Sequence, residues 1–485
     1  MTPRPHLTLA ASVTGAVVVA LDGTVLTIAQ PAMQRDLHAT FAQIQWTSTG
    51  YLIAVAALLV LSGRLGDRYG HRNVFAAGTL GFAVTSAAIA LAPGIGWVIG
   101  LRVAQGVFGA LLQPATLGML RAALPADRLP MAVAVRSSAI GLAAAAGPLV
   151  GGALTAQFGW RAVFLLNVVP ALAIAAATPA IRLPRPDAAV GVPDSDGARR
   201  VPAPGAAGVV RGAGQADRLG PAGAGLLAVA LAGLVHALVE LPRTGWTWSS
   251  ALGLGAAAVA GGAFARHQRV AAHPLIPRQV LAPGPLTAAL AVLLAASAAM
   301  FGALFVGSYF LQEVLALDPL ESGLHVLPLA VMMVAGAPVA AVLLRRQGAR
   351  RTVLGAMALV SGGMLLLACV DRSAASPTMM AAFLLMGAGF GTVMVTATAV
   401  VVREAPVGDV GVSGGLKQTV LNVGPAVGIA LATATITLLA PGPAGSPWTA
   451  AAFGGAMGPA LLLLAAVAAL GVPAALKLPA RAAGP

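Results

Sequence analysis

Long, uninterrupted apolar segments recur along the whole chain and limit what it can fold into. Residues 7–28, 74–92 and 131–156 are examples. A helix needs about 20 such residues to cross a bilayer, and only helices and closed barrels satisfy their backbone polar groups in hydrocarbon. The segments are continuous rather than alternating, which favours helices over barrel strands. Only 9% of the residues are charged, against about 25% in soluble domains. The sequence therefore predicts an all-α membrane protein.

The apolar segments predict about fourteen membrane spans, arranged in two groups with an additional pair between them. We expect residues 1–181 to form an N-terminal six-helix bundle, 221–265 two additional transmembrane helices, and 286–485 a C-terminal six-helix bundle. The stretch 182–220 is rich in Pro, Arg and Asp and is expected to be a disordered cytoplasmic loop, with a cytoplasmic connector at 266–285. A twelve-span alternative lays the middle pair on the membrane surface, but its polar face is too thin for an interfacial helix.

The basic residues indicate how the chain is oriented. We place four in outward loops and two within spans, which leaves 23 of the 29 Lys and Arg on the other side. The four are Arg35, Arg161, Arg243 and Arg372, and the two are Arg102 and Arg136. Because cytoplasmic loops carry the excess of positive charge, we expect both termini in the cytoplasm. A basic arm that binds lipid or nucleic acid is the weaker interpretation of the +14 formal charge.

An internal repeat is visible in two places. The segment Gly147–Gly151 (GPLVG) reappears as Gly424–Gly428 (GPAVG), and residues 67–72 are echoed by residues 345–350 at nearly the same offset. Two similar halves in parallel orientation are typical of transporters that work by alternating access. The repeat therefore favours a secondary transporter.

Asp22 and Arg102 are the clearest charges inside the predicted spans. A charge at the centre of a span costs about 2.5–3.5 kcal/mol on insertion scales, and such residues usually face a cavity or a proton relay. Burial favours the protonated carboxyl group, whereas a nearby cation favours the ionised one. A carboxyl group between these influences can load and release a proton. The alternatives are a structural hydrogen bond for Asp22 and snorkelling to the outer interface for Arg102.

A charged segment with several glycines, GRLGDRYGHR, links the second and third predicted spans. It resembles the cytoplasmic-loop signature of the major facilitator superfamily, which acts there as a conformational latch. The resemblance rests on Gly63, Asp67, Arg68, Gly70 and Arg72. His71 stands where the family usually has a second basic residue. An ordinary charged loop is the alternative.

Three further motifs resemble the fourteen-helix drug:proton antiporter branch of that superfamily. The run from Leu21 through Asp22 to Pro31 is similar to its first-span signature, and Arg102 to Gly109 is similar to R-x-x-Q-G-x-G, whose arginine is implicated in proton coupling. The antiporter motif is matched by Gly147, Pro148, Gly151 and Gly152. The resemblance implies two six-helix bundles with two extra central helices. It also implies proton-driven export of small hydrophobic or amphipathic compounds.

Two other functions stay open: a dedicated exporter of one endogenous metabolite or antibiotic, and a membrane sensor that transports nothing. Gln105, Gln312 and Glu313 are candidates for substrate contacts or counter-ions, with an interfacial position as the alternative for Glu313. We expect no enzyme activity, metal or cofactor, because the chain shows neither a nucleophile–base constellation nor metal-ligand spacing.

The expected partners and location follow from these interpretations. The partners are a small-molecule substrate, protons and the lipid bilayer, without nucleic acid, and we expect the chain to act as a monomer. Its richness in Ala, Gly and Arg, with Lys417 and Lys477 as the only lysines, is typical of a high-GC bacterial genome. We therefore expect a multi-pass protein of the bacterial cell membrane.

Overall fold

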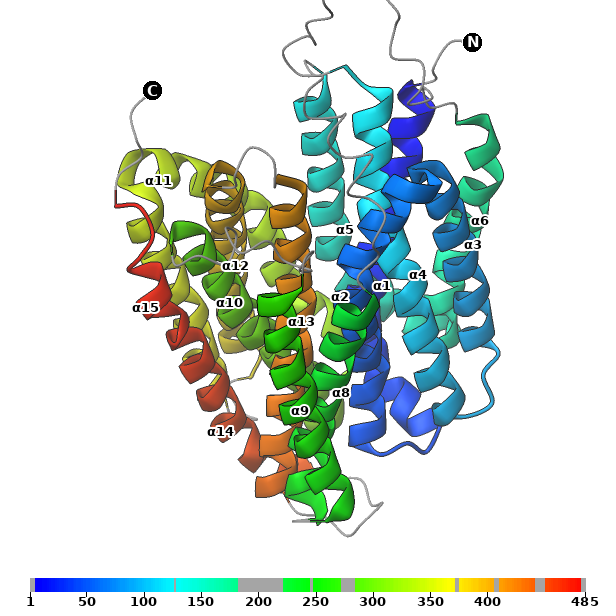
Figure 1. Cartoon of the computed structure of the whole chain (residues 1–485). Coiled ribbons are helices and arrows are strands. Elements are labelled where there is room, and N and C mark those ends of the chain that lie inside the picture. Colours follow the sequence, from blue (N-terminus) through cyan, green and yellow to red (C-terminus); the bar gives the residue numbers. More distant parts are fainter. Residues whose placement is uncertain are drawn as a thin grey trace, which may run out of the picture.

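The computed structural model describes most of the chain, and the described part is built of helices without a strand. It covers residues 5–125, 128–181, 221–244, 247–271, 284–370, 375–404, 410–440 and 450–480. The expected loop at 182–220 and most of the connector at 266–285 lie outside these residues. Both labelled termini lie at the same end of the molecule (Figure 1).

The helices form an N-terminal half, a C-terminal half and a pair between them. The N-terminal half consists of α1 (Pro5–Asp36), α2 (Phe41–Tyr69), α3 (His71–Ala90), α4 (Ile95–Ala123), α5 (Leu129–Phe158), α6 (Arg161–Ala177) and the short η1 (Thr178–Ala180). The pair is α8 (Pro221–Thr244) and α9 (Trp248–Val270). The C-terminal half consists of α10 (Pro285–Tyr309), the π-helical turn η3 (Phe310–Val314), α11 (Pro319–Ala368), α12 (Ala375–Glu404), α13 (Val410–Leu439), α14 (Ala450–Ala469) and α15 (Gly471–Ala475).

Within the described residues, eleven helices are long and apolar enough to cross a membrane by length and composition. The expectation of about fourteen spans is thus supported only in part. Neither α2 nor α8 is among the eleven, and α8 has a shorter apolar core, Ala222–Leu238. The 50-residue α11 counts once, although the backbone at Gly348 (φ 79°, ψ 169°) is not helical. That conformation is essentially restricted to glycine, so Gly348 divides α11 into two parts.

The two halves are structural duplicates. Adding 278 to the bounds of α2 and α3 gives those of the two parts of α11 on either side of Gly348, and Gly70, at the matching position, also has a positive φ of 85°. The capping interactions at the N-terminal ends of these helices repeat as well. Thr40 and Gln43 form a capping box at the start of α2, and Asp318 and Glu321 form one at the start of α11. The sequence repeat therefore reflects a repeated arrangement of helices.

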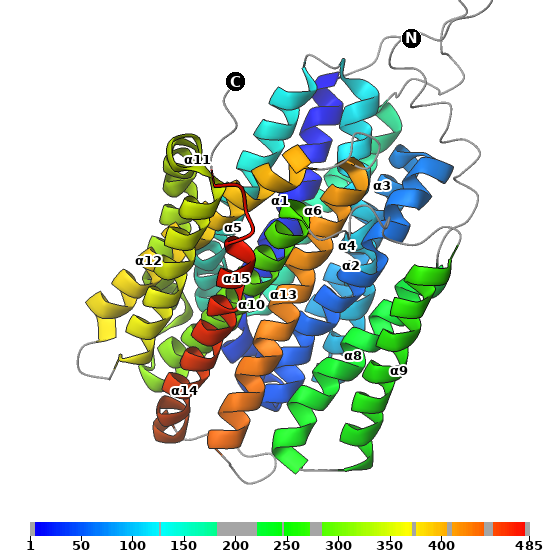
Figure 2. The same cartoon turned by 60° about the vertical axis from the view of Figure 1, so that its left-hand side comes forward.

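The halves meet along two pairs of helices, α5 with α11 and α2 with α13. The pair α8–α9 packs through α8 against α2 and α13, along the seam between the halves (Figure 2). A buried cluster joins these three elements, with Ala42 and Ile53 from α2, Val235 from α8, and Ala426 and Ala430 from α13. The second helix of the pair continues to Val270 rather than ending near residue 265.

The halves are fastened to each other at the end remote from the termini. The Phe41 ring of α2 lies 5.0 Å from that of Phe305 and 4.7 Å from that of Tyr309, both on α10. Arg35 at the end of α1 pairs with Glu313 of η3 at 2.5 Å. We call these the remote-end contacts.

Candidate functional site

A buried ion pair lies in the middle of the N-terminal half. The Nη1 atom of Arg102 (α4) donates to Oδ2 of Asp22 (α1) at 2.6 Å. Asp22 is 2% exposed and Arg102 1% exposed, so the pair has almost no contact with solvent. Losing one member of such a pair leaves an uncompensated charge and costs about 3–5 kcal/mol. The two intramembrane charges that the sequence singles out are therefore partners of each other.

Three amide and hydroxyl groups complete the surroundings of the carboxylate. Asn167 Nδ2 of α6 donates to Asp22 Oδ1 at 2.8 Å, and Gln105 Nε2 donates to the same oxygen at 3.3 Å. The same Gln105 nitrogen also donates to Ser86 Oγ of α3 at 2.7 Å, and Gln105 Oε1 accepts from Arg102. We call Asp22, Ser86, Arg102, Gln105 and Asn167 the coupling cluster. Four helices, α1, α3, α4 and α6, supply its side chains.

A fifth helix, α2, holds the guanidinium from the other side. Arg102 Nε donates to the Thr47 carbonyl at 2.9 Å. The guanidinium carbon also lies 4.3 Å from the centre of the Tyr51 ring, a distance at which a cation is attracted to an aromatic face. Any change in the charge of Asp22 therefore acts on the contacts that hold α2 and α4 together.

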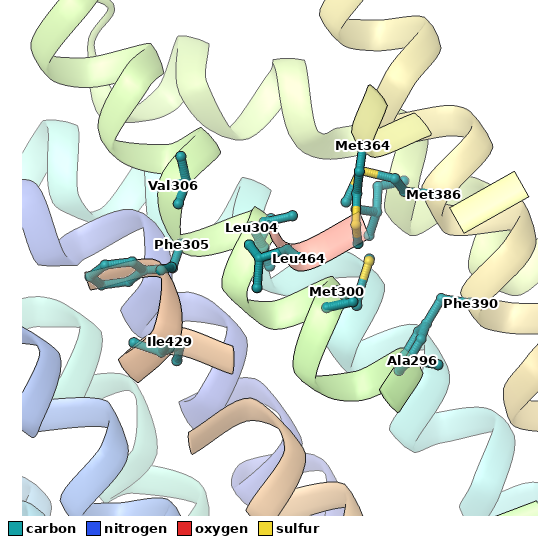
Figure 3. Close-up of a cluster of buried hydrophobic side chains, with 14 of the residues drawn as sticks. Ala296, Met300, Leu304, Phe305, Val306, Met364, Met386, Phe390, Ile429 and Leu464 are labelled. Carbon is teal, nitrogen blue, oxygen red and sulfur yellow. The ribbon is translucent and has the colours of Figure 1, made fainter. Parts of the chain in front are cut away.

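The duplicated half has an apolar cluster where the N-terminal half has the coupling cluster. Adding 278 to Asp22 and Ser86 gives Met300 and Met364. Aligning Gly106 with Gly387 places Phe383 opposite Arg102 and Met386 opposite Gln105. All four are buried, and Met300, Met364 and Met386 lie close to one another in Figure 3. The buried charge pair is thus a feature of one half alone within the described residues.

The predicted latch segment lies at the turn between α2 and α3. Gly70 occupies the positive-φ turn, Arg72 Nη1 donates to the Ile181 carbonyl at 3.3 Å, and Arg68 lies over the Tyr69 ring. Gly63 packs near Pro114 of α4. The Asp67 side chain lies outside the described part of the structure, so its role stays a prediction.

The glycines of the antiporter motif lie where α1, α5 and α11 meet. A Cβ atom on Gly151 would lie 2.7 Å from the Val25 carbonyl oxygen, one turn from Asp22. One on Gly152 would lie 3.0 Å from Leu320 Cα in the other half. Pro148 lies on the same face, because a Cβ on Gly323 of α11 would meet its carbonyl oxygen. The motif therefore lets α5 pack closely against α1, which carries the carboxylate, and against α11 of the opposite half.

The remaining predicted residues lie apart from one another. Gln105 belongs to the coupling cluster. Gln312 Nε2 donates to the Ile28 carbonyl at 2.8 Å, so it joins η3 to α1. Glu313 is occupied by Arg35 in the remote-end contacts.

Sequence reasoning missed the roles of Ser86, Thr47 and Tyr51, and it assigned none to Asn167. Ser86 and Tyr51 are polar residues inside apolar segments, which most spans of this chain contain. Thr47 holds Arg102 through its backbone carbonyl, which no residue type reveals. Within the described residues, no group of three His, Cys, Asp or Glu side chains is placed to hold a metal ion.

The sequence matches the Major Facilitator Superfamily over residues 13–429 and 289–484. The chain belongs to this family. It is accordingly a membrane transporter and not an enzyme. The D-xylose–proton symporter has the same fold, with a TM-score of 0.63, 13% identity and coverage of 98% of both chains.

Several transport and resistance proteins are also similar over most of their length. The tetracenomycin C resistance and export protein of Streptomyces glaucescens is 37% identical, over 88% of this chain and 75% of that protein. The multidrug efflux pump LfrA of Mycolicibacterium smegmatis is 30% identical, over 88% of this chain and 80% of that protein. The puromycin resistance protein of Streptomyces alboniger is 31% identical, over 88% of this chain and 81% of that protein.

Proposed function

We propose that this major facilitator protein exports small amphipathic compounds from the cytoplasm in exchange for protons. The observation that carries the proposal is the coupling cluster, a single carboxylate paired with a cation and closed off from water between five helices. The names of the relatives, which denote resistance, efflux and export, support the outward direction. The fold alone would suit uptake equally well.

The cluster suggests how a proton changes the conformation. Protonation of Asp22 removes the charge that holds Arg102 Nη1, while the bond from Nε to the Thr47 carbonyl stays available. The link between α1 and α4 is thereby weakened. The end of α1 carries Arg35, and its middle packs on Gly151, so a shift of α1 reaches both the remote-end contacts and the seam with α11.

We further propose fourteen spans with both termini in the cytoplasm. The 29-residue α2, the 24-residue α8 and the division of α11 at Gly348 support three spans beyond the eleven that meet the length and composition criterion. In this orientation the remote-end contacts close the outer side, and the molecule faces the cytoplasm.

The test uses inside-out vesicles and a panel of amphipathic xanthene dyes, including cationic rhodamine 123 and anionic fluorescein. An acidic vesicle interior should drive accumulation of at least one dye, and a protonophore should abolish it. Asp22→Asn should reduce accumulation at least tenfold, because the variant cannot release a proton. Downhill dye exchange without a gradient should continue, since it needs no proton.

Asp36→Asn is the matched control, because Asp36 lies on the same helix but is half exposed and pairs with Arg161 at the surface. It should transport like the wild type. The variant Asp22→Asn with Arg102→Gln removes both buried charges and so avoids leaving one unpaired. Gradient-driven accumulation by this double variant at the wild-type rate would refute the coupling role.

A further inference from the structure

Two cations that the coupling cluster does not use lie on corresponding helices of the two halves. Arg136 is on α5 and Lys417 on α13. Each precedes the repeated Gly-Pro segment of its helix, and Lys417 lies about one helical turn nearer to that segment. Both helices belong to the seam between the halves, since α5 packs on α11 and α13 packs on α2.

The two side chains share one electrostatic environment. Lys417 lies within electrostatic range of the Arg136 guanidinium, and both residues are half-buried. Like charges in a region of low dielectric constant repel each other. Neither α5 nor α13 contains an acidic residue, and Asp22 is already paired with Arg102. Nothing in the described structure neutralises this pair of positive charges.

Polar groups around the cations still have free hydrogen-bonding capacity. Arg136 Nη2 donates to Thr116 Oγ1 at 2.9 Å, but its Nε is shielded from solvent and has no partner. On α13, the hydroxyl group of Ser413, one turn before Lys417, is buried without a partner as well. Buried polar groups normally have hydrogen-bond partners. These unused groups point to a ligand that accepts hydrogen bonds.

We infer that Arg136 and Lys417, one from each half, bind an anionic group of the exported molecule between them. The inference rests on the proposed export function and specifies its substrate class: amphipathic organic acids, such as carboxylates and phenolates. A cationic substrate would need a free carboxylate. The candidate counter-ion Glu313 is paired with Arg35, and Glu240 of α8 also has an interaction of its own.

The position of the two cations suits a substrate that enters from the cytoplasm. Both precede the Gly-Pro segments and so lie nearer to the end of the termini, whereas the remote-end contacts join the halves at the other end. Because each half contributes one cation, the binding of an anion also depends on the distance between the two halves.

Binding to the purified full-length protein tests this inference without any gradient. Fluorescein and rhodamine 123 share a xanthene ring system but carry opposite charge, so fluorescence anisotropy can compare them directly. The wild type should bind fluorescein more tightly. Arg136→Gln and Lys417→Gln should each raise its Kd at least tenfold, while the Kd for rhodamine 123 should not rise. Arg136→Lys and Lys417→Arg should restore most of the affinity, because they restore the charge.

Arg266→Gln serves as the control, because it removes an exposed cation from α9, outside both halves. It should bind both dyes like the wild type. The inference fails if wild-type protein shows no saturable fluorescein binding, if it prefers rhodamine 123, or if the double Gln variant binds fluorescein normally. Proton-driven accumulation of rhodamine 123 alone would refute the anion site and leave the export function standing, whereas accumulation of no dye would refute the export function.

Discussion

Arg102 uses a single nitrogen, Nη1, for both Asp22 and Gln105. A neutral side chain at position 22 therefore leaves a cation that is still bonded to Gln105 and to the Thr47 carbonyl. A neutral side chain at position 102 instead leaves a buried carboxylate with only two amide donors, from Asn167 and Gln105. Neutralising Asp22 and neutralising Arg102 therefore leave different unpaired charges, so the two substitutions are not equivalent.

A double-mutant cycle on Asp22→Asn and Arg102→Gln should reveal strong coupling. Each single variant leaves one buried charge without its partner, which costs about 3–5 kcal/mol, whereas the double variant leaves none. We therefore expect the double variant to be more stable than Arg102→Gln alone, measured by thermal unfolding in detergent. Additive effects of the two substitutions would contradict a direct interaction.

Sequence reasoning could predict these two residues but not their pairing. Asp22 and Arg102 stand out because a charge inside an apolar segment is costly. They lie 80 residues apart, and no local pattern states which helices become neighbours. Likewise, the contact of Asn167 with Asp22 depends on the packing of α6 against α1, which the sequence does not state.

At the scale of the helix, the glycines of α5 determine how closely its neighbours approach. Small residues let membrane helices pack with their backbones in contact. The substitution Gly151→Ala places a Cβ 2.7 Å from the Val25 carbonyl oxygen of α1, so α5 and α1 must separate. We expect at least a tenfold loss of gradient-driven export in the vesicle assay at normal expression.

Gly141→Ala is the matched control for this prediction. It lies on the same helix, and a Cβ there would meet nothing within 4 Å. It should export at the wild-type rate. Equal activity of both variants would show that the close approach of α1 and α5 is not required.

The existence of most helices could be predicted from their apolar segments, because length and hydropathy are local properties. Residues 322–344 and 352–370 are two separate apolar segments. They correspond to the two parts of α11, and Gly348 between them marks the turn. The packing of α8 along the seam is different. It depends on the surfaces of α2 and α13, which are far from α8 in the sequence.

For the whole molecule, the remote-end contacts must break in each cycle if they close the outer side. Arg35→Cys with Glu313→Cys, in a Cys369→Ser background that removes the only native cysteine, allows a short reversible thiol cross-linker to join the halves there. Cross-linking should stop gradient-driven export, and reduction should restore it. Undiminished export by fully cross-linked protein would show that this end does not open.

The C-terminal half has an apolar cluster where the N-terminal half has the coupling cluster, and this difference has an electrical consequence. Since Asp22 is the only acidic residue among the buried side chains that the structure describes, the proposed exchange has one such carboxylate to carry a proton in each cycle. Moving one elementary charge across 100 mV corresponds to about 2.3 kcal/mol. A monoanion that leaves as a proton enters moves two charges in the same electrical sense, about 4.6 kcal/mol at that voltage. A monovalent cation exchanged for one proton moves no net charge. Under the proposed exchange, the sign of the substrate charge therefore determines whether the membrane voltage contributes to export or only the pH difference does.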